Sequence, residues 1–159
     1  MWTTFSGCPI EDLFDEIERL TREFEAASAE FEIHIGTDSQ LSSQGTDFVT
    51  AVCLRQPGHG GRVYTCRSSE DRDLHLSHKL ILEAERSLEV ARELDPRLSS
   101  RIFVHVDANL DPRHRSSTYA GTLSGMVLGH GFEVKLKPDS WCATHVADHC
   151  VRNTRRDAA

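Results

Sequence analysis

The sequence has no long hydrophobic run, no CxxC motif and few aromatic residues. None of its apolar stretches approaches the roughly 20 residues that a membrane-spanning helix needs, so we expect no membrane partner. The first residues, MWTTFSGCP, lack the basic and apolar regions of a secretory signal. Five cysteines, an odd number without metal-type spacing, are typical of reduced thiols. These absences together predict a cytoplasmic protein.

Positive charge is also scarce. The 159 residues contain 18 lysines and arginines against 25 aspartates and glutamates, for a net charge of −7. This balance excludes a bulk, non-specific nucleic-acid binder that is driven by phosphate neutralisation. It does not exclude a nuclease, because bound divalent ions compensate clustered carboxylates. The glycine-rich segment QPGHGG lacks the GxxxxGK[ST] pattern, so we interpret it as a hairpin turn and not as a phosphate loop.

What remains is the composition of an ordinary globular protein, with 38% hydrophobic and 27% charged residues. A chain of this length is large enough to bury its own core without disulfides. We therefore expect a single domain over residues 1–159. It consists of an amphipathic N-terminal helix at residues 9–27 and a core at residues 31–153, with no repeat and no linker.

Three segments with alternating apolar and polar residues each end in an aspartate. They are residues 31–40 (FEIHIGTDSQ, with Asp38), residues 101–107 (RIFVHVD, with Asp107) and residues 132–139 (FEVKLKPD, with Asp139). The alternation predicts β-strands. Aspartate commonly follows strands because it initiates turns, so the coincidence has functional meaning only if the strands are neighbours.

Two further carboxylates lie on the packing faces of predicted helices. Glu83 belongs to the helix predicted over residues 74–95 and interrupts its mostly apolar stripe. Asp148 shares the inner stripe of the last helix with Trp141 and Thr144. A carboxylate that points inward needs a cation, a metal ion or a proton. Both residues are therefore candidates for a buried site, although a paired glutamate at a helix edge explains Glu83 equally well.

The order of elements predicts an α/β fold. The first three strands are joined by short turns, as in an antiparallel meander, and the last two alternate with helices, as in right-handed parallel crossovers. The expected result is a mixed five-stranded sheet with antiparallel first, second and third strands, parallel fourth and fifth strands, helices on its faces and an extra N-terminal helix. This order and its acidic residues resemble the ribonuclease H fold.

A set of ordered motifs narrows the resemblance to the YkuK-type family of predicted ribonuclease H-related proteins. The resemblance covers roughly residues 30–153. The motifs are GTDSQ (36–40), GGR (60–62), SLEVA (87–91), HVDAN (105–109) and KPDSW…VAD (137–148). The resemblance to this family implies cleavage of phosphodiester bonds in RNA, DNA or a hybrid. Two divalent ions, Mg²⁺ or Mn²⁺, would carry out the cleavage, and carboxylate oxygens would hold them.

The resemblance also assigns roles to residues. Asp38 is expected to bridge both ions, Asp107 to bind one of them, and Glu83 to complete the site. The fourth carboxylate is either Asp139, by its strand-end position, or Asp148, by resemblance of its segment. Nine helical residues span about 13 Å, so both cannot hold one pair of ions.

Lys135 and Lys137 share the strand parity of Asp139 and are candidates to bind a substrate phosphate; a solvated strand face is the simpler explanation. His34 and His105 lie on the same faces of their strands as the strand aspartates. They could support the metal ligands or act as general acid–base groups, and an ordinary interior histidine is the simpler explanation for each.

Three alternatives remain open at this stage. Cys142, His145 and His149 recur on one helix and could present soft ligands to Zn²⁺. The protein could be a non-catalytic member of the fold that binds nucleic acid or protein. It could also hydrolyse a small phosphorylated molecule, which suits the lack of a basic stripe and of stacking aromatics.

Overall fold

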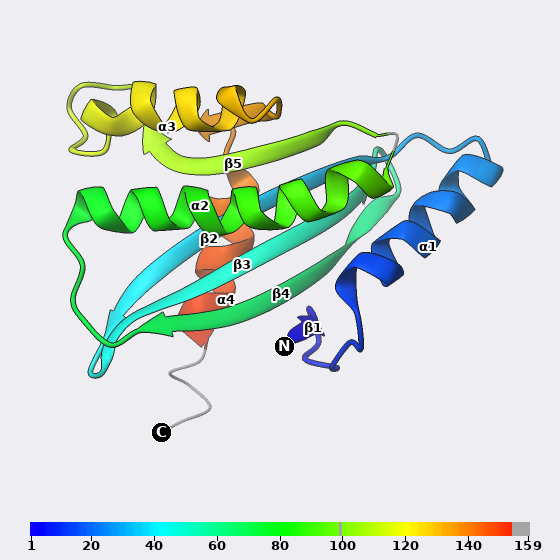
Figure 1. Ribbon diagram of the computed structural model, residues 1–159, viewed down its shortest axis with the longest axis horizontal. Coiled ribbons are helices and arrows are strands. Elements are labelled where there is room, and N and C mark those ends of the chain that lie inside the picture. Colours follow the sequence, from blue (N-terminus) through cyan, green and yellow to red (C-terminus); the bar gives the residue numbers. More distant parts are fainter. Residues whose placement is uncertain (99, 154–159) are drawn as a thin grey trace.

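One mixed sheet of six strands organises the structure (Figure 1). The computed structural model describes residues 1–98 and 100–153. The strands are β1 (Trp2–Thr4), β2 (Glu32–Ser42), β3 (Gly45–Gln56), β4 (Gly60–Glu70), β5 (Ile102–Asn109) and β6 (Glu133–Lys137). Their order across the sheet is β1-β4-β3-β2-β5-β6. The strands β2, β3 and β4 form an antiparallel meander, and β5 and β6 continue the sheet in parallel. The predicted α/β fold is confirmed.

The sequence predicts five strands and the structure has six. The additional strand is β1, which pairs antiparallel with the outer edge of β4, so that Trp2 lies opposite Cys66. Three residues are too few to show a period-2 pattern, and backbone pairing with β4 is what defines this strand.

The helices are α1 (Leu13–Ala26), α2 (Leu76–Leu94), α3 (Ser117–Gly129) and α4 (Asp148–Asn153), with two irregular turns, the 3₁₀ turn η1 (Asp95–Arg97) and the π-helical turn η2 (Cys142–Ala147). The first helix begins four residues later than the predicted start at residue 9. Asp12 caps it, because its side chain accepts hydrogen bonds from the backbone N–H groups of Phe14 and Asp15. No helix in residues 1–98 and 100–153 has the length and apolar character to cross a bilayer.

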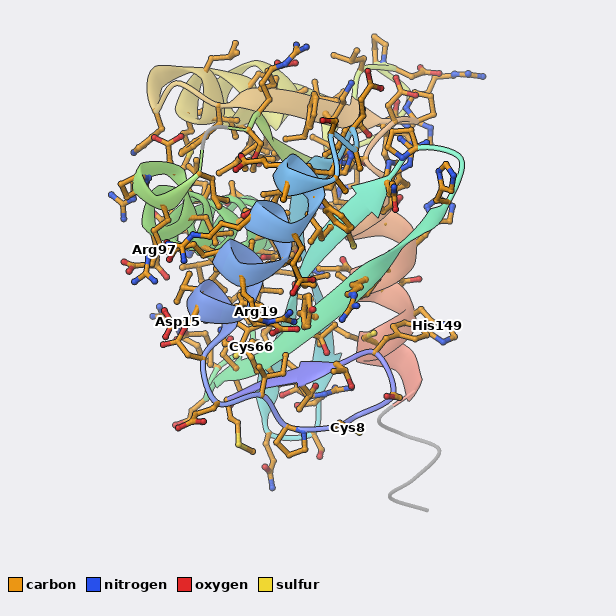
Figure 2. All side chains as sticks on the ribbon, turned by 90° about the vertical axis from the view of Figure 1, so that its right-hand side faces the viewer. Cys8, Asp15, Arg19, Cys66, Arg97 and His149 are labelled. Carbon is orange, nitrogen blue, oxygen red and sulfur yellow. The ribbon has the colours of Figure 1, made fainter. Side chains whose placement is uncertain are left out.

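The two faces of the sheet are covered differently. The larger core lies on one face, where α1, α2 and α3 pack on Ile33, Ile35 and Val104. The helix α1 is also joined to η1 by an ion pair of 3.1 Å between Asp15 and Arg97 (Figure 2). The N-terminal helix therefore packs on the protein's own sheet. Among the described residues, the η2–α4 segment covers the other face and runs behind the strands (Figure 1).

A glycine in β2 lets η2 approach the sheet closely. A Cβ atom added at Gly36 would lie 2.6 Å from the backbone nitrogen of Ala143 and 2.9 Å from its Cα. Such distances are shorter than van der Waals contact, and backbone atoms cannot rotate out of the way as a side chain does. Only glycine at position 36 allows the segment that leads to Asp148 to rest on β2.

We expect Gly36→Ala to lower the free energy of unfolding by about 1–3 kcal/mol, because the added methyl group overpacks the contact with η2. Gly125→Ala is the matched control, since Gly125 is exposed in α3 and an added Cβ there meets nothing within 4 Å. The control should gain about 0.5–1 kcal/mol from helix propensity. Urea unfolding measures both, and a Gly36→Ala protein as stable as the parent would contradict the close approach.

Candidate metal-binding site

Three aspartates from different elements line one open pocket of about 220 Å³. Asp38 comes from β2, Asp107 from the neighbouring parallel strand β5, and Asp148 from the first turn of α4. In the parallel register Gly36 lies level with His105. Asp38 and Asp107 each follow this pair by two residues, and both line the pocket. The remaining lining residues are Ser39, Gln40, Lys137 and Thr144.

The structure distinguishes the two candidates for the fourth carboxylate. Asp148 lines the pocket, and its charge contributes to raising the pKa of Asp38. Asp139 is exposed in the turn after β6, where its backbone N–H donates to the carbonyl of Leu136 at 2.7 Å. It does not line the pocket. The geometry thus brings Asp148 to Asp38 and leaves Asp139 outside.

Glu83 lies behind the pocket, on the opposite face of the sheet. Its side chain is 3% exposed and accepts a hydrogen bond of 2.6 Å from the hydroxyl of Ser39, the neighbour of Asp38. The second carboxylate oxygen of Glu83, Oε2, has no hydrogen-bond partner. One helical turn earlier, the ammonium of Lys79 donates to the Ser39 carbonyl at 3.1 Å. Glu83 therefore contacts the strand segment that carries Asp38 through Ser39.

The importance of Ser39 and Lys79 escaped the sequence analysis. The alternation of β2 contains a signal for Ser39, because Ser39 and Thr37 have the parity opposite to Asp38 and so must face α2. Thr37 and Ser87 of α2 are indeed joined by a hydrogen bond of 2.9 Å between their hydroxyls. No comparable signal marks Lys79, since its contact is to a backbone carbonyl.

Burial and mutual repulsion make the ionised carboxylates unfavourable. Burial raises the pKa of Asp38 to about 7, with further contributions from the charges of Asp107 and Asp148. Burial also raises the pKa of Glu83 to about 8, and the charges of Asp38 and Asp107 add to it. A bound cation removes this penalty by compensating the charge.

Of the two predicted phosphate-binding lysines, one reaches the pocket. Lys137 lines it, and its ammonium forms an ion pair with the carboxylate of Asp107. The ammonium of Lys135 instead lies 5.0 Å from the centroid of the Phe103 ring, a cation–π arrangement, and Lys135 is not in the pocket lining.

The two strand histidines form a buried network beside the pocket and do not line it. The backbone N–H of Cys142 donates to Nδ1 of His105 at 3.3 Å, so the proton of this neutral ring is on Nε2. His105 Nε2 then donates to His34 Nδ1 at 2.9 Å, and His34 Nε2 donates to Glu32 at 3.1 Å. Burial lowers the pKa of both rings, that of His105 to about 3. The network ties the start of η2 to β2 and β5.

The zinc hypothesis is wrong in this geometry. Cys142 is buried with its sulfur 3.4 Å from that of Cys53, whereas His145 is exposed and hydrogen-bonds to Thr144. His149 is exposed on α4 and stacks on Phe5, as its outer position in Figure 2 illustrates. The helix turns these three side chains in different directions, so they do not surround one point.

The pocket has the donor set of a hard divalent ion. Its charged donors are carboxylate oxygens, which Mg²⁺ and Mn²⁺ prefer. The buried oxygen Oε2 of Glu83 has no hydrogen-bond partner, and Oδ1 of Asp107 has no hydrogen bond besides its ion pair with Lys137. Within the described residues, no three acidic, histidine or cysteine side chains are placed closely enough to hold one ion. The carboxylate oxygens of the pocket are of the type that a divalent ion prefers. A bound ion would have to draw Asp38, Asp107 and Asp148 closer together.

Comparisons with known proteins identify the family of this chain. Residues 12–152 match the family described as ribonuclease H-like, and this protein belongs to that family. It is similar to the uncharacterized protein YkuK of Bacillus subtilis (strain 168), with 27% identity over 135 residues, 76% of this chain and 78% of that protein. The resemblance to the YkuK-type family is thereby confirmed. A solved structure, the N-terminal RNase H domain of rv2228c from Mycobacterium tuberculosis fused to maltose-binding protein, matches 82% of this chain and 100% of that chain at 11% identity, with a TM-score of 0.35.

The raised pKa values predict how stability depends on pH. Asp38 and Glu83 keep protons in the folded protein at pH values where the unfolded chain has lost them. Their contribution to stability is therefore fully present below about pH 4 and is lost progressively as pH rises from there to about 7 to 8. We expect Asp38→Asn to raise the free energy of unfolding of the metal-free protein at pH 8 by about 1–3 kcal/mol, and to raise it by a clearly smaller amount at pH 5.

Urea unfolding in EDTA at the two pH values measures this difference. Asp139→Asn is the matched control, because it removes one exposed carboxylate outside the pocket. An Asp38→Asn protein that is no more stable than the control at pH 8 would show that Asp38 is not electrostatically strained.

Proposed function

We propose that this protein is a divalent-metal-dependent nuclease that cleaves phosphodiester bonds of RNA, DNA or an RNA–DNA hybrid. The observation that carries the proposal is the convergence of Asp38, Asp107 and Asp148 on one pocket, with Glu83 buried behind it. A ribonuclease H-like fold supports a nucleic-acid-related function. The raised pKa of Asp38 also supports the proposal. An ionised carboxylate in this position costs folding stability, which is typical of a residue kept for a function such as cation binding.

In this proposal the chain's residues have distinct roles. The charges of Asp107 and Asp148 both act on Asp38, so Asp38 would be the central carboxylate of the three that would hold the Mg²⁺ or Mn²⁺ ions. When bound, such ions would supply an activated water and neutralise charge at the leaving oxygen. Glu83 fixes Ser39, and through it the strand segment of Asp38. Lys137 contributes positive charge for a phosphate oxygen.

The size of the pocket favours a polymer over a small phosphorylated molecule. Sites that enclose a small ligand usually measure about 300–1,000 Å³. At about 220 Å³, this pocket has room for a phosphodiester group and not for a whole nucleotide. The rest of the substrate would then lie on the surface outside the pocket.

Cleavage of labelled RNA, DNA and hybrid strands in Mg²⁺, in Mn²⁺ and in EDTA tests the proposal. Activity should require the metal, and Asp38→Asn or Asp148→Asn should lower it on the order of 100-fold or more, because each removes a charged ligand. Asp139→Asn should retain activity within about threefold, since Asp139 is outside the pocket.

Two results would count against this assignment. Equal loss in Asp139→Asn and Asp148→Asn would contradict the choice of ligands. Absence of metal-dependent cleavage on every strand type, together with retained binding of nucleic acid, would indicate the non-catalytic alternative.

A further inference from the structure

Lys137 is the one cationic residue among the described residues that line the carboxylate pocket. Its ammonium forms an ion pair with Asp107, and the two side chains are 37% and 23% exposed. The pair is thus partly shielded from water, where charges interact more strongly than on an open surface. In the absence of a metal ion, Lys137 supplies the positive charge that Asp107 needs.

The backbone places this lysine at Asp107. The strands β5 and β6 pair in register up to His105 and Lys135, and the next pair is Asn109 with Lys137. Four residues of β5 therefore correspond to two residues of β6, and Asp107 is in the middle of this irregular stretch. The bulge sets Asp107 beside the end of β6, where Lys137 is located.

We infer that Lys137 is an internal counter-cation that a divalent ion has to displace from Asp107, and that the displaced ammonium then binds a phosphate oxygen of the substrate. This inference rests on the proposed function. An ammonium and a divalent ion are attracted to the same carboxylate, so they compete for it. A lysine side chain suits such an exchange, because its four-carbon stem is flexible and its charge is compact.

The competition has a measurable consequence. Removing the ammonium takes away both a competitor for Asp107 and a positive charge that repels the incoming ion. We expect Lys137→Gln to bind Mn²⁺ about 10-fold more tightly than the parent protein. The same variant should bind nucleic acid more weakly once metal is present, because the phosphate loses its cationic partner.

Lys135→Gln is the matched control. Lys135 is on the same strand, two residues earlier and on the same face, but its ammonium lies over the Phe103 ring. The substitution Lys135→Gln removes one positive charge, as Lys137→Gln does, but it does not remove the ion-pair partner of Asp107. Its Mn²⁺ affinity should change less than about twofold, and Lys137→Arg, which keeps the charge, should resemble the parent.

Isothermal titration of Mn²⁺ into the four full-length proteins, without substrate, tests the exchange. Tighter Mn²⁺ binding in Lys137→Gln alone supports the exchange. Mn²⁺ binding that is detectable in this variant and in none of the other three proteins also supports it. Equal or weaker binding in Lys137→Gln overturns it, as does equal tightening in Lys135→Gln, which would reflect net charge. Thermal unfolding of the metal-free proteins verifies that each variant is folded.

A cleavage assay on the same proteins separates this inference from the proposed function. A parent protein that cleaves nucleic acid but has the same Mn²⁺ affinity as Lys137→Gln keeps the nuclease assignment and overturns the exchange. Tightened binding in Lys137→Gln without cleavage by any of the proteins supports the exchange at Asp107 and removes the nuclease assignment. Absence of Mn²⁺ binding in all four proteins overturns both.

Discussion

The parallel pairing of β2 and β5 is the constraint on which the pocket depends. Its register sets Gly36 level with His105, and Asp38 and Asp107 each follow this pair by two residues and line the same pocket. The two carboxylates come from adjacent strands of one sheet, which keeps them close to each other although their charges repel. Burial, and after it the charges of Asp107 and Asp148, raises the pKa of Asp38 to about 7. Proteins retain such strained groups where function requires them.

The elements that cover the two faces of the sheet bring further carboxylates near Asp38 and Asp107. The glycine at position 36 lets η2 rest directly on β2, and the histidine network from Cys142 to Glu32 fixes where η2 begins. Asp148 follows at the start of α4 and so reaches the pocket from above the sheet. Glu83 acts from the far face through Ser39. Each of these contacts positions a carboxylate or the segment that carries it. The close contact between η2 and Gly36 therefore serves to place Asp148.

The sequence predicted the parts of this arrangement that depend on periodicity. Alternation located Asp38 and Asp107, and the helical stripe identified Glu83 as an inward-facing acid; all of these are placed at or behind the pocket. The choice between Asp139 and Asp148 depends on how the last helix folds back over the sheet, and no local pattern encodes that. The strand β1 is too short for a pattern, and the different positions of Lys135 and Lys137 follow from a bulge in a neighbouring strand.

X-ray diffraction from crystals soaked in Mn²⁺, recorded at the manganese absorption edge, tests the central claim most directly. The account predicts two anomalous peaks about 3.5–4 Å apart, with Asp38 between them and Asp107 and Asp148 on either side. It also predicts that the ammonium of Lys137 has left Asp107. Peaks elsewhere in the molecule, or none at saturating Mn²⁺ with the Lys137–Asp107 pair intact, would contradict the assignment of this pocket as a metal centre.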